Sequence, residues 1–114
     1  MIFNFMLSTF VKIVVTVPIT HADIVRQAIG EAGGGKIGAY GHCSFSFPGT
    51  GRFLPLDGAK PAIGKVGRLE QVEEERIEIT VERTLLQNVV KAIQGSHPYE
   101  KIALDIYPLE DVDF

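Results

Sequence analysis

The chain has 114 residues, 46% of them hydrophobic, and a formal net charge of −3. That length and composition suit one domain with a single core. Acidic and basic residues are interspersed without a basic patch, which argues against a nucleic-acid or anionic-membrane surface. The single cysteine, Cys43, cannot form an internal disulfide, which favours a cytoplasmic protein.

The first half of the chain begins with an apolar stretch that is too short to span a bilayer and has no signal-peptide flanks. We expect residues 1–9 to form an N-terminal extension and residues 10–114 to form one domain. The β-branched run 10–18 predicts a strand with both faces at least partly covered. A capping-box-like pair, Thr20 and Asp23, then predicts an amphipathic helix that ends at the glycines 33–35.

The segment 37–47 alternates between apolar and polar side chains and predicts a second strand. One predicted face carries Ala39, Gly41, Cys43, Phe45 and Phe47, and the other carries Tyr40, His42, Ser44 and Ser46. Glycines and prolines punctuate residues 48–67, which predicts a long excursion with room for a short hairpin at 52–56.

The last part of the chain repeats the strand–helix–strand pattern. A long strand is predicted up to Glu82, with Ile77, Ile79 and Val81 on its apolar face. The five glutamates between residues 70 and 78 are expected to line a solvated edge or to form cross-strand ion pairs. Thr84 begins a second helix that Gly95 ends, and a final strand follows over 102–107.

The resulting order, β-α-β-β-α-β with a long loop between the second and third strands, predicts an α+β ferredoxin-like split βαβ sandwich. Both helices would cover the same face of a four-stranded antiparallel sheet. The open face would be too polar for a dry core, so it either faces water or meets copies of itself. Its predicted residues are Lys12, Val14, Thr16, Tyr40, His42, Ser44, Arg76, Glu78, Thr80, Ala103, Asp105 and Tyr107.

Several motifs together resemble a known family. The segment "GSHPYEKIALDIYPL" is similar to the His-Pro-Tyr-Glu segment of CutA-type divalent-cation-tolerance proteins. "IGAYGHCSF", "GTGRFLPL", "IGKVG" and "VEEERIE" extend the resemblance to the PII/CutA-like domain inserted in YqfO-type proteins of the NGG-interacting-factor-three-like family. The resemblance spans roughly residues 12–109 and departs at Lys101, where a second acidic residue often stands.

The resemblance implies a homotrimeric PII/CutA-like module whose open sheet faces turn toward a threefold axis. The long loop would then project near clefts between subunits. The larger family carries a dinuclear metal site on a separate domain, and some members are described as a type of GTP cyclohydrolase. Because the resemblance covers only the inserted module, we expect no catalysis by this chain.

Candidate site residues fall into two groups. His42, on the predicted open face, would gather around a threefold axis as a metal cluster, and His97 with Glu100 would bind a divalent metal at a subunit cleft. Tyr40, Arg52 and Tyr99 are the candidate ligand-binding residues; Arg52 follows two glycines whose backbone N–H groups could approach an anion. For each of these residues, a structural role in a turn, strand or trimer interface is the alternative.

Three functional hypotheses follow. The first is a small homotrimeric regulatory or sensory binding module for a divalent metal or a small anion. The second is a metal-dependent hydrolase resembling GTP cyclohydrolase, which three scattered histidines support poorly. The third is a protein-interaction module that docks on a larger family member. None of the three involves nucleic acid or a membrane, and the one cofactor considered is a divalent metal ion.

Overall fold

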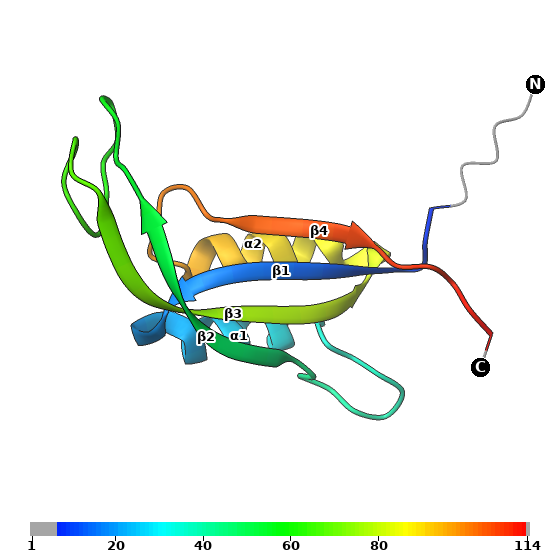
Figure 1. Ribbon diagram of the computed structural model, residues 1–114. Helices are drawn as coiled ribbons and strands as arrows, with labels where there is room; N and C mark the ends of the chain where they lie inside the picture. Colours follow the sequence, from blue (N-terminus) through cyan, green and yellow to red (C-terminus); the bar gives the residue numbers. More distant parts are fainter. Residues whose placement is uncertain (1–6, 114) are drawn as a thin grey trace, which may run out of the picture.

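The computed structural model describes residues 7–113. The first six residues of the predicted N-terminal extension lie outside this part. The elements are β1 (Phe10–Pro18), the 3-10 turn η1 (Ile19–His21), α1 (Ala22–Glu31), β2 (Phe45–Phe53), β3 (Glu70–Glu82), the 3-10 turn η2 (Arg83–Leu85), α2 (Leu86–Ser96) and β4 (Leu104–Pro108) (Figure 1). Neither α-helix is long and apolar enough to cross a membrane.

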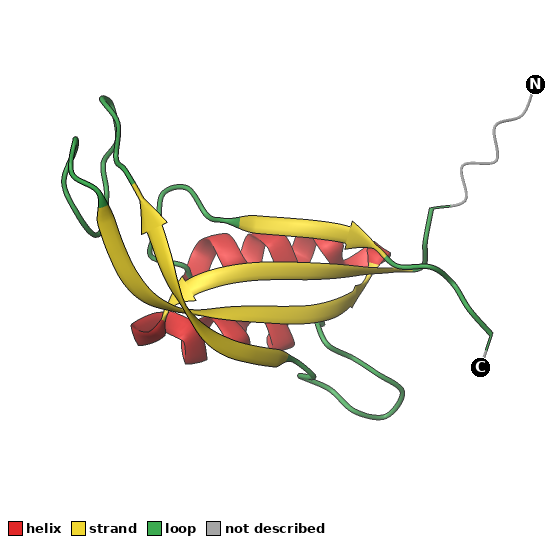
Figure 2. Cartoon of the chain, viewed as in Figure 1, coloured by secondary structure: helices red, strands yellow, loops and turns green. Residues whose placement is uncertain are grey.

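The sheet has the strand order β2-β3-β1-β4, and every neighbouring pair is antiparallel. Both helices lie against the same face of this sheet, and the other face is left open (Figure 2). This is the predicted ferredoxin-like arrangement. It follows from two β-α-β units that each place their helix on one side of the sheet.

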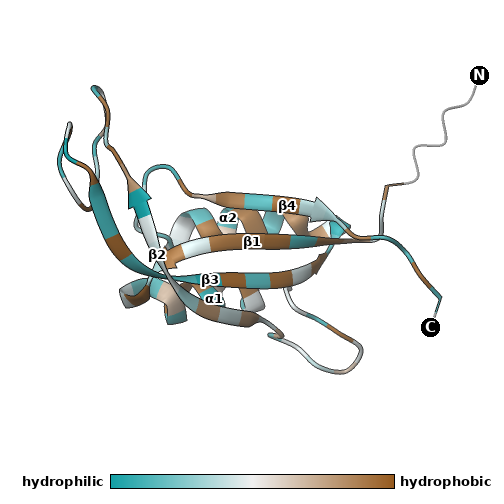
Figure 3. Cartoon of the chain, in the orientation of Figure 1, coloured by the Kyte–Doolittle hydropathy of each residue, from teal (hydrophilic) through white to brown (hydrophobic). Residues whose placement is uncertain are grey.

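The core lies between the helices and the two central strands. The predicted alternation on β1 is confirmed, since Val11, Ile13, Val15 and Val17 are fully buried. Hydrophobic residues run along much of this strand (Figure 3). Burying each such side chain stabilises the fold by about 1.5–3 kcal/mol relative to leaving it exposed. The remaining buried members of the core are Ala22, Val25, Ile29, Ile77, Ile79, Val81, Val89 and Ile93.

The helix ends differ from the prediction at three of four places. Each helix follows a 3-10 turn, and neither has a side-chain cap bond from the predicted Thr20 or Thr84. The 3-10 turns leave those side chains out of capping position, and Thr20 Oγ1 instead lies 2.9 Å from His21 Nδ1. Gly95 lies inside α2, which ends at Ser96 before Pro98. Only the glycine end of α1 is as predicted.

The second strand begins eight residues later than predicted. Residues 36–44 form a loop in which His42 has a left-handed backbone with φ of 56°. The Gly35 N–H donates to the Thr80 carbonyl of β3, and the Cys43 N–H donates back to the Gly35 carbonyl. These bonds occupy the edge of β3 where the predicted strand would have paired, so the chain between them turns outward. Cys43 is therefore a partly buried loop residue and not a core strand thiol.

The two faces of β2 are also the reverse of the prediction. Phe45 pairs with Glu78 and Phe47 with Arg76, which places both aromatic rings on the open face. Ser46 faces the helices, where its hydroxyl accepts a 3.1 Å hydrogen bond from Arg26. Residues 48–53, which were predicted to begin the long excursion, are part of β2, and the connection 54–69 contains no strand in place of the predicted hairpin.

Candidate functional site

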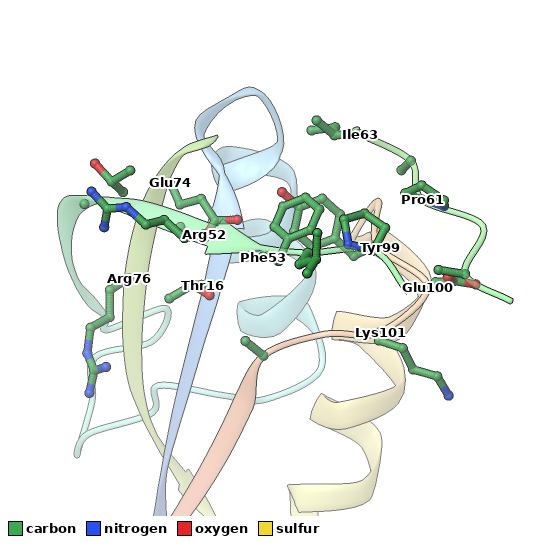
Figure 4. A pocket seen from close by; sticks show the side chains of 18 of the residues that line it. Thr16, Arg52, Phe53, Pro61, Ile63, Glu74, Arg76, Tyr99, Glu100 and Lys101 are labelled. Atoms are coloured by element: carbon green, nitrogen blue, oxygen red, sulfur yellow. The ribbon is translucent and has the colours of Figure 1, made fainter. Parts of the chain in front are cut away.

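A cleft of about 620 Å³ lies at one end of the open sheet face. Strands β1, β2 and β3 supply its floor, and the connection 54–69 and the turn after α2 supply its walls (Figure 4). One wall of the cleft is aromatic: the Phe53 and Tyr99 rings lie edge to face with centroids 5.7 Å apart. The other large apolar lining residues are Phe47, Leu54, Pro55, Leu56, Pro61 and Ile63.

His97 connects the C-terminal end of α2 to β1, next to the cleft. It is 7% exposed, and its Nε2 lies 2.8 Å from the Thr16 carbonyl of β1. The Tyr99 N–H donates to Nδ1 over 3.1 Å, so Nε2 carries the proton that bonds Thr16. Burial lowers the pKa of His97, which keeps the ring neutral at physiological pH. Both ring nitrogens are thus engaged within the chain.

Tyr99 and Glu74 lie together beneath the apolar wall. Burial, followed by the negative charge of Glu74, raises the pKa of the Tyr99 hydroxyl well above its usual value. The hydroxyl oxygen is fully buried, and the Glu74 carboxylate lies beside it just outside full hydrogen-bond geometry. Glu74 is only 7% exposed. The sequence pattern had assigned it to a solvated edge, and this expectation is wrong.

The mouth of the cleft is held by a bond between two segments. The Lys60 N–H donates to Glu100 Oε1 over 2.8 Å, which ties the connection 54–69 to the turn after α2. Arg52 is exposed on β2, and its guanidinium extends away from the rings (Figure 4). The structure therefore brings three predicted site residues, Arg52, Tyr99 and Glu100, to one cleft.

Of the other three predicted site residues, His97 lies at the joint between α2 and β1 described above, and Tyr40 and His42 lie elsewhere. Tyr40 is 75% exposed in the loop 36–44. His42 is not on the open sheet face, because its ring packs directly over Gly30 of α1, where even a methyl group would collide with it. No group of three or more His, Cys, Asp and Glu side chains is arranged to hold a metal ion within the described chain. His42 therefore does not occupy the open-face position from which the predicted threefold metal cluster was built, and His97 with Glu100 does not by itself form a metal site within the described chain.

Sequence reasoning missed Glu74 and two aromatic residues of the cleft, Phe47 and Phe53. The alternation of β3 did place Glu74 on the open face, but the pattern contains no signal for its burial. That burial depends on Gly51 of β2, whose missing side chain leaves room for the carboxylate. Apolar walls around a few polar groups are typical of sites for small organic ligands.

Comparison with proteins of known sequence identifies the region to which this chain corresponds. No family model matches. The chain is 52% identical over 99 residues to a GTP cyclohydrolase 1 type 2 homolog from Bacillus subtilis, a match that covers 87% of this chain and 26% of that protein. It is 53% identical over 98 residues to the homolog from Halalkalibacterium halodurans, covering 86% of this chain and 26% of that one. The chain thus spans about a quarter of the length of these curated relatives.

Solved structures match both the region and the fold. A Bacillus cereus protein related to NIF3 superposes with a TM-score of 0.79 and 48% identity, covering 92% of this chain and 27% of that one. CutA1 from Shewanella sp. SIB1 matches with a TM-score of 0.69 and 16% identity, covering 93% and 86% of the two chains. CutA from Archaeoglobus fulgidus gives 0.64 and 18%, covering 90% and 86%. The chain therefore matches a region of NIF3-related proteins and has a CutA-like fold.

Proposed function

We propose that this chain is a homotrimeric regulatory or sensory binding module of the cytoplasm, with a divalent metal ion or a small anion bound at the subunit seams. Catalysis is not part of this role. The observation that carries the proposal is the open sheet face, which presents large aromatic side chains to the surface. Phe45 is 67% exposed, Phe47 42% and Tyr107 49%.

These aromatic side chains lie on opposite edges of the same face. Phe45 and Phe47 are neighbours on β2, with ring centroids 6.0 Å apart, and Tyr107 is on β4. Exposed aromatic groups on an otherwise charged surface are typical of interaction sites. If the β2 edge of one copy meets the β4 edge of the next, the contact is heterologous. Such contacts close into a ring when the rotation from one copy to the next divides a full turn evenly. This favours a trimer over a twofold dimer.

The cleft at the end of this face is the candidate ligand site. Arg52, exposed at its rim, is available to an anion, and Glu100 has a second carboxylate oxygen for a cation. A metal site would have to combine residues of neighbouring copies. Metal analysis of the purified protein, repeated on His42→Ala and Glu100→Gln, tests this. Bound metal that both variants retain would contradict the assignment of these residues.

The enzymatic alternative is favoured by the name of the curated relatives. They are GTP cyclohydrolase 1 type 2 homologs, of which this chain matches about a quarter. If this chain carries that activity, metal-loaded protein should convert GTP.

If it serves instead as an interaction module, it should bind the part of such a relative that lies outside the matched region, and a pull-down with that part measures this directly.

The trimer is tested by size-exclusion chromatography with light scattering. The wild-type protein is expected at three times the 12.5 kDa chain mass. Phe45→Glu adds a charge to the proposed interface, beside Glu78, and is expected to yield monomers. Ile24→Glu is the matched control, because Ile24 is 56% exposed on α1, away from the open face. A monodisperse wild-type monomer would overturn the proposal.

A further inference from the structure

Glu74 is a buried carboxylate without a cationic partner. Only 7% of it is exposed, no ion pair neutralises it within residues 7–113, and the group beside it that can donate to it is the Tyr99 hydroxyl. The neighbouring Glu75, by contrast, accepts a 2.6 Å bond from Arg26 on the helix side. A charged group removed from water without a partner is costly to the fold. A group of this kind that lines a cleft points to a donor brought by a ligand.

The position of this carboxylate depends on a glycine across the sheet. A Cβ on Gly51 of β2 would lie 2.0 Å from Glu74 Oε1, so only glycine leaves the carboxylate its place. Gly51 does not have a left-handed backbone, so conformational freedom does not explain it. Close approach of a side chain does explain it. The sheet is thus shaped to keep Glu74 over β2, at the floor of the cleft.

The Tyr99 hydroxyl lies at the same place, and its oxygen is fully buried. Burial first, and then the charge and hydrogen bonding of Glu74, raise its pKa, although no group in the described residues bonds it with full hydrogen-bond geometry. The hydroxyl can accept one hydrogen bond while donating another. A ligand N–H group placed here would satisfy the carboxylate and the hydroxyl together.

The basic residues around the cleft do not neutralise Glu74. Arg52, Arg76 and Lys101 extend away from the Phe53 and Tyr99 rings, whereas Glu74 points toward them (Figure 4). Arg76 Nε instead pairs with Glu78 Oε2 over 3.2 Å. The charge of the cleft floor is therefore negative, and its walls are aromatic and aliphatic.

We propose that the cleft binds a small organic cation, an amidinium, a guanidinium or a protonated amine on an apolar body, with its N–H groups on Glu74 and Tyr99. The apolar body packs against Phe47 and Phe53, and the volume of about 620 Å³ lies in the range of small-molecule sites. Charge-assisted hydrogen bonds to a buried carboxylate are among the stronger polar contacts in proteins. This inference rests on the proposed role as a binding module, assigns an organic cation in place of the small anion to the floor of this cleft, and does not require the trimer.

The test is calorimetric titration of the full chain with benzamidine, a planar cation on an apolar ring. Benzamide, its neutral counterpart, and benzoate, an anion of similar size, are titrated in parallel. The wild-type protein is expected to bind benzamidine saturably and both other compounds at least tenfold more weakly. Glu74→Gln removes the charge and Gly51→Ala displaces the carboxylate, and each is expected to weaken benzamidine binding at least tenfold.

Matched controls separate this effect from misfolding. Glu82→Gln removes a carboxylate at the exposed end of the same strand, and Gly41→Ala adds a methyl group where no atom lies within 4 Å. Both are expected to bind like the wild type. Thermal unfolding of each variant provides the folding control; Glu74→Gln is expected to keep or raise the Tm, because it removes an unpaired buried charge.

Three results would overturn the inference: no benzamidine binding by the wild-type protein, equal binding of benzamide, or unchanged binding by Glu74→Gln. The first is also the result expected if a neighbouring copy places its own basic side chain on Glu74. The titration tests this inference, and the light-scattering experiment tests the trimer separately. A trimer that ignores benzamidine contradicts only this inference, and a monomer that binds it contradicts only the trimer.

Discussion

Replacing His97 with alanine is expected to lower the free energy of unfolding and to remove an acid sensitivity of the fold. In the native chain, the ring donates to the Thr16 carbonyl of β1 and accepts from the Tyr99 N–H. It also lies against the Tyr99 ring, with centroids 5.1 Å apart. One side chain thus joins the end of α2 to the central strand and to the cleft.

The magnitude follows from these contacts. Each hydrogen bond contributes about 1 kcal/mol net, and leaving its buried partner unsatisfied adds to the loss. The ring contact contributes about 0.5–1.5 kcal/mol. Because water can enter the space and restore part of the bonding, we expect a total loss of about 2–4 kcal/mol for His97→Ala.

The pH dependence has a definite sign. Burial lowers the pKa of His97 in the folded chain below the value of 6.5 of the unfolded chain. Below pH 6.5 the unfolded chain therefore binds more protons, and the free energy of unfolding falls as the pH falls. The contribution of neutral His97 is complete above this range and is lost progressively as the pH drops from 6.5 toward the folded pKa.

Urea unfolding followed by circular dichroism, at pH 7.5 and pH 5.5 and one protein concentration, measures both effects. His97→Ala should be less stable at pH 7.5 and should lose less stability than the wild type on acidification. His42→Ala is the control, and it should keep the acid sensitivity because it leaves the His97 ring and its charged neighbours in place. A loss below about 1 kcal/mol, or an unchanged pH dependence in His97→Ala, would refute the reasoning.

Two further substitutions test the core and the loop before β2. Ile79→Ala creates a cavity in the core and should cost about 2–5 kcal/mol in chemical denaturation, whereas Leu56→Ala, at a position 68% exposed, should change stability by less than about 0.5 kcal/mol. Gly35→Ala should lower the Tm by several degrees, because φ is +79° and the new Cβ would lie 2.3 Å from the Cys43 carbonyl oxygen. Gly41→Ala meets open space and should leave the Tm unchanged; equal effects at the two glycines would contradict this account.

The candidate site could be predicted only in part. The structure brings Tyr99 and Glu100 of the turn "HPYE" together with Arg52 at one cleft, because proline ends the helix and the long connection lies near the turn. The binding role predicted for these residues stays a prediction. The chemistry of the cleft was not predictable. His97 is a structural group engaged through both nitrogens, and the buried polar pair beside the cleft consists of Glu74 and the Tyr99 hydroxyl.

The sequence by itself determined the architecture. Alternation along 10–18 and 77–81, and the helical stripes that include Val25 and Val89, state which side of each element is apolar. The repeat of apolar side chains along one segment depends only on that segment. It therefore shows which face of the helix or strand must be buried, without knowledge of distant residues. The order of the elements then left the ferredoxin-like sheet as the arrangement that buries them.

Only the tertiary structure decided where β2 begins and which glutamate is buried. Because the Gly35 N–H bonds the Thr80 carbonyl, β2 begins only at Phe45. Phe45 and Phe47 then lie on the open face of the sheet and not on the predicted core face. The burial of Glu74 depends on Gly51 across the sheet. Both outcomes rest on contacts between segments far apart in the chain, and the alternation of one strand contains no record of its neighbour. For that reason the aromatic open face and the charged floor of the cleft emerge only when the strands are assembled.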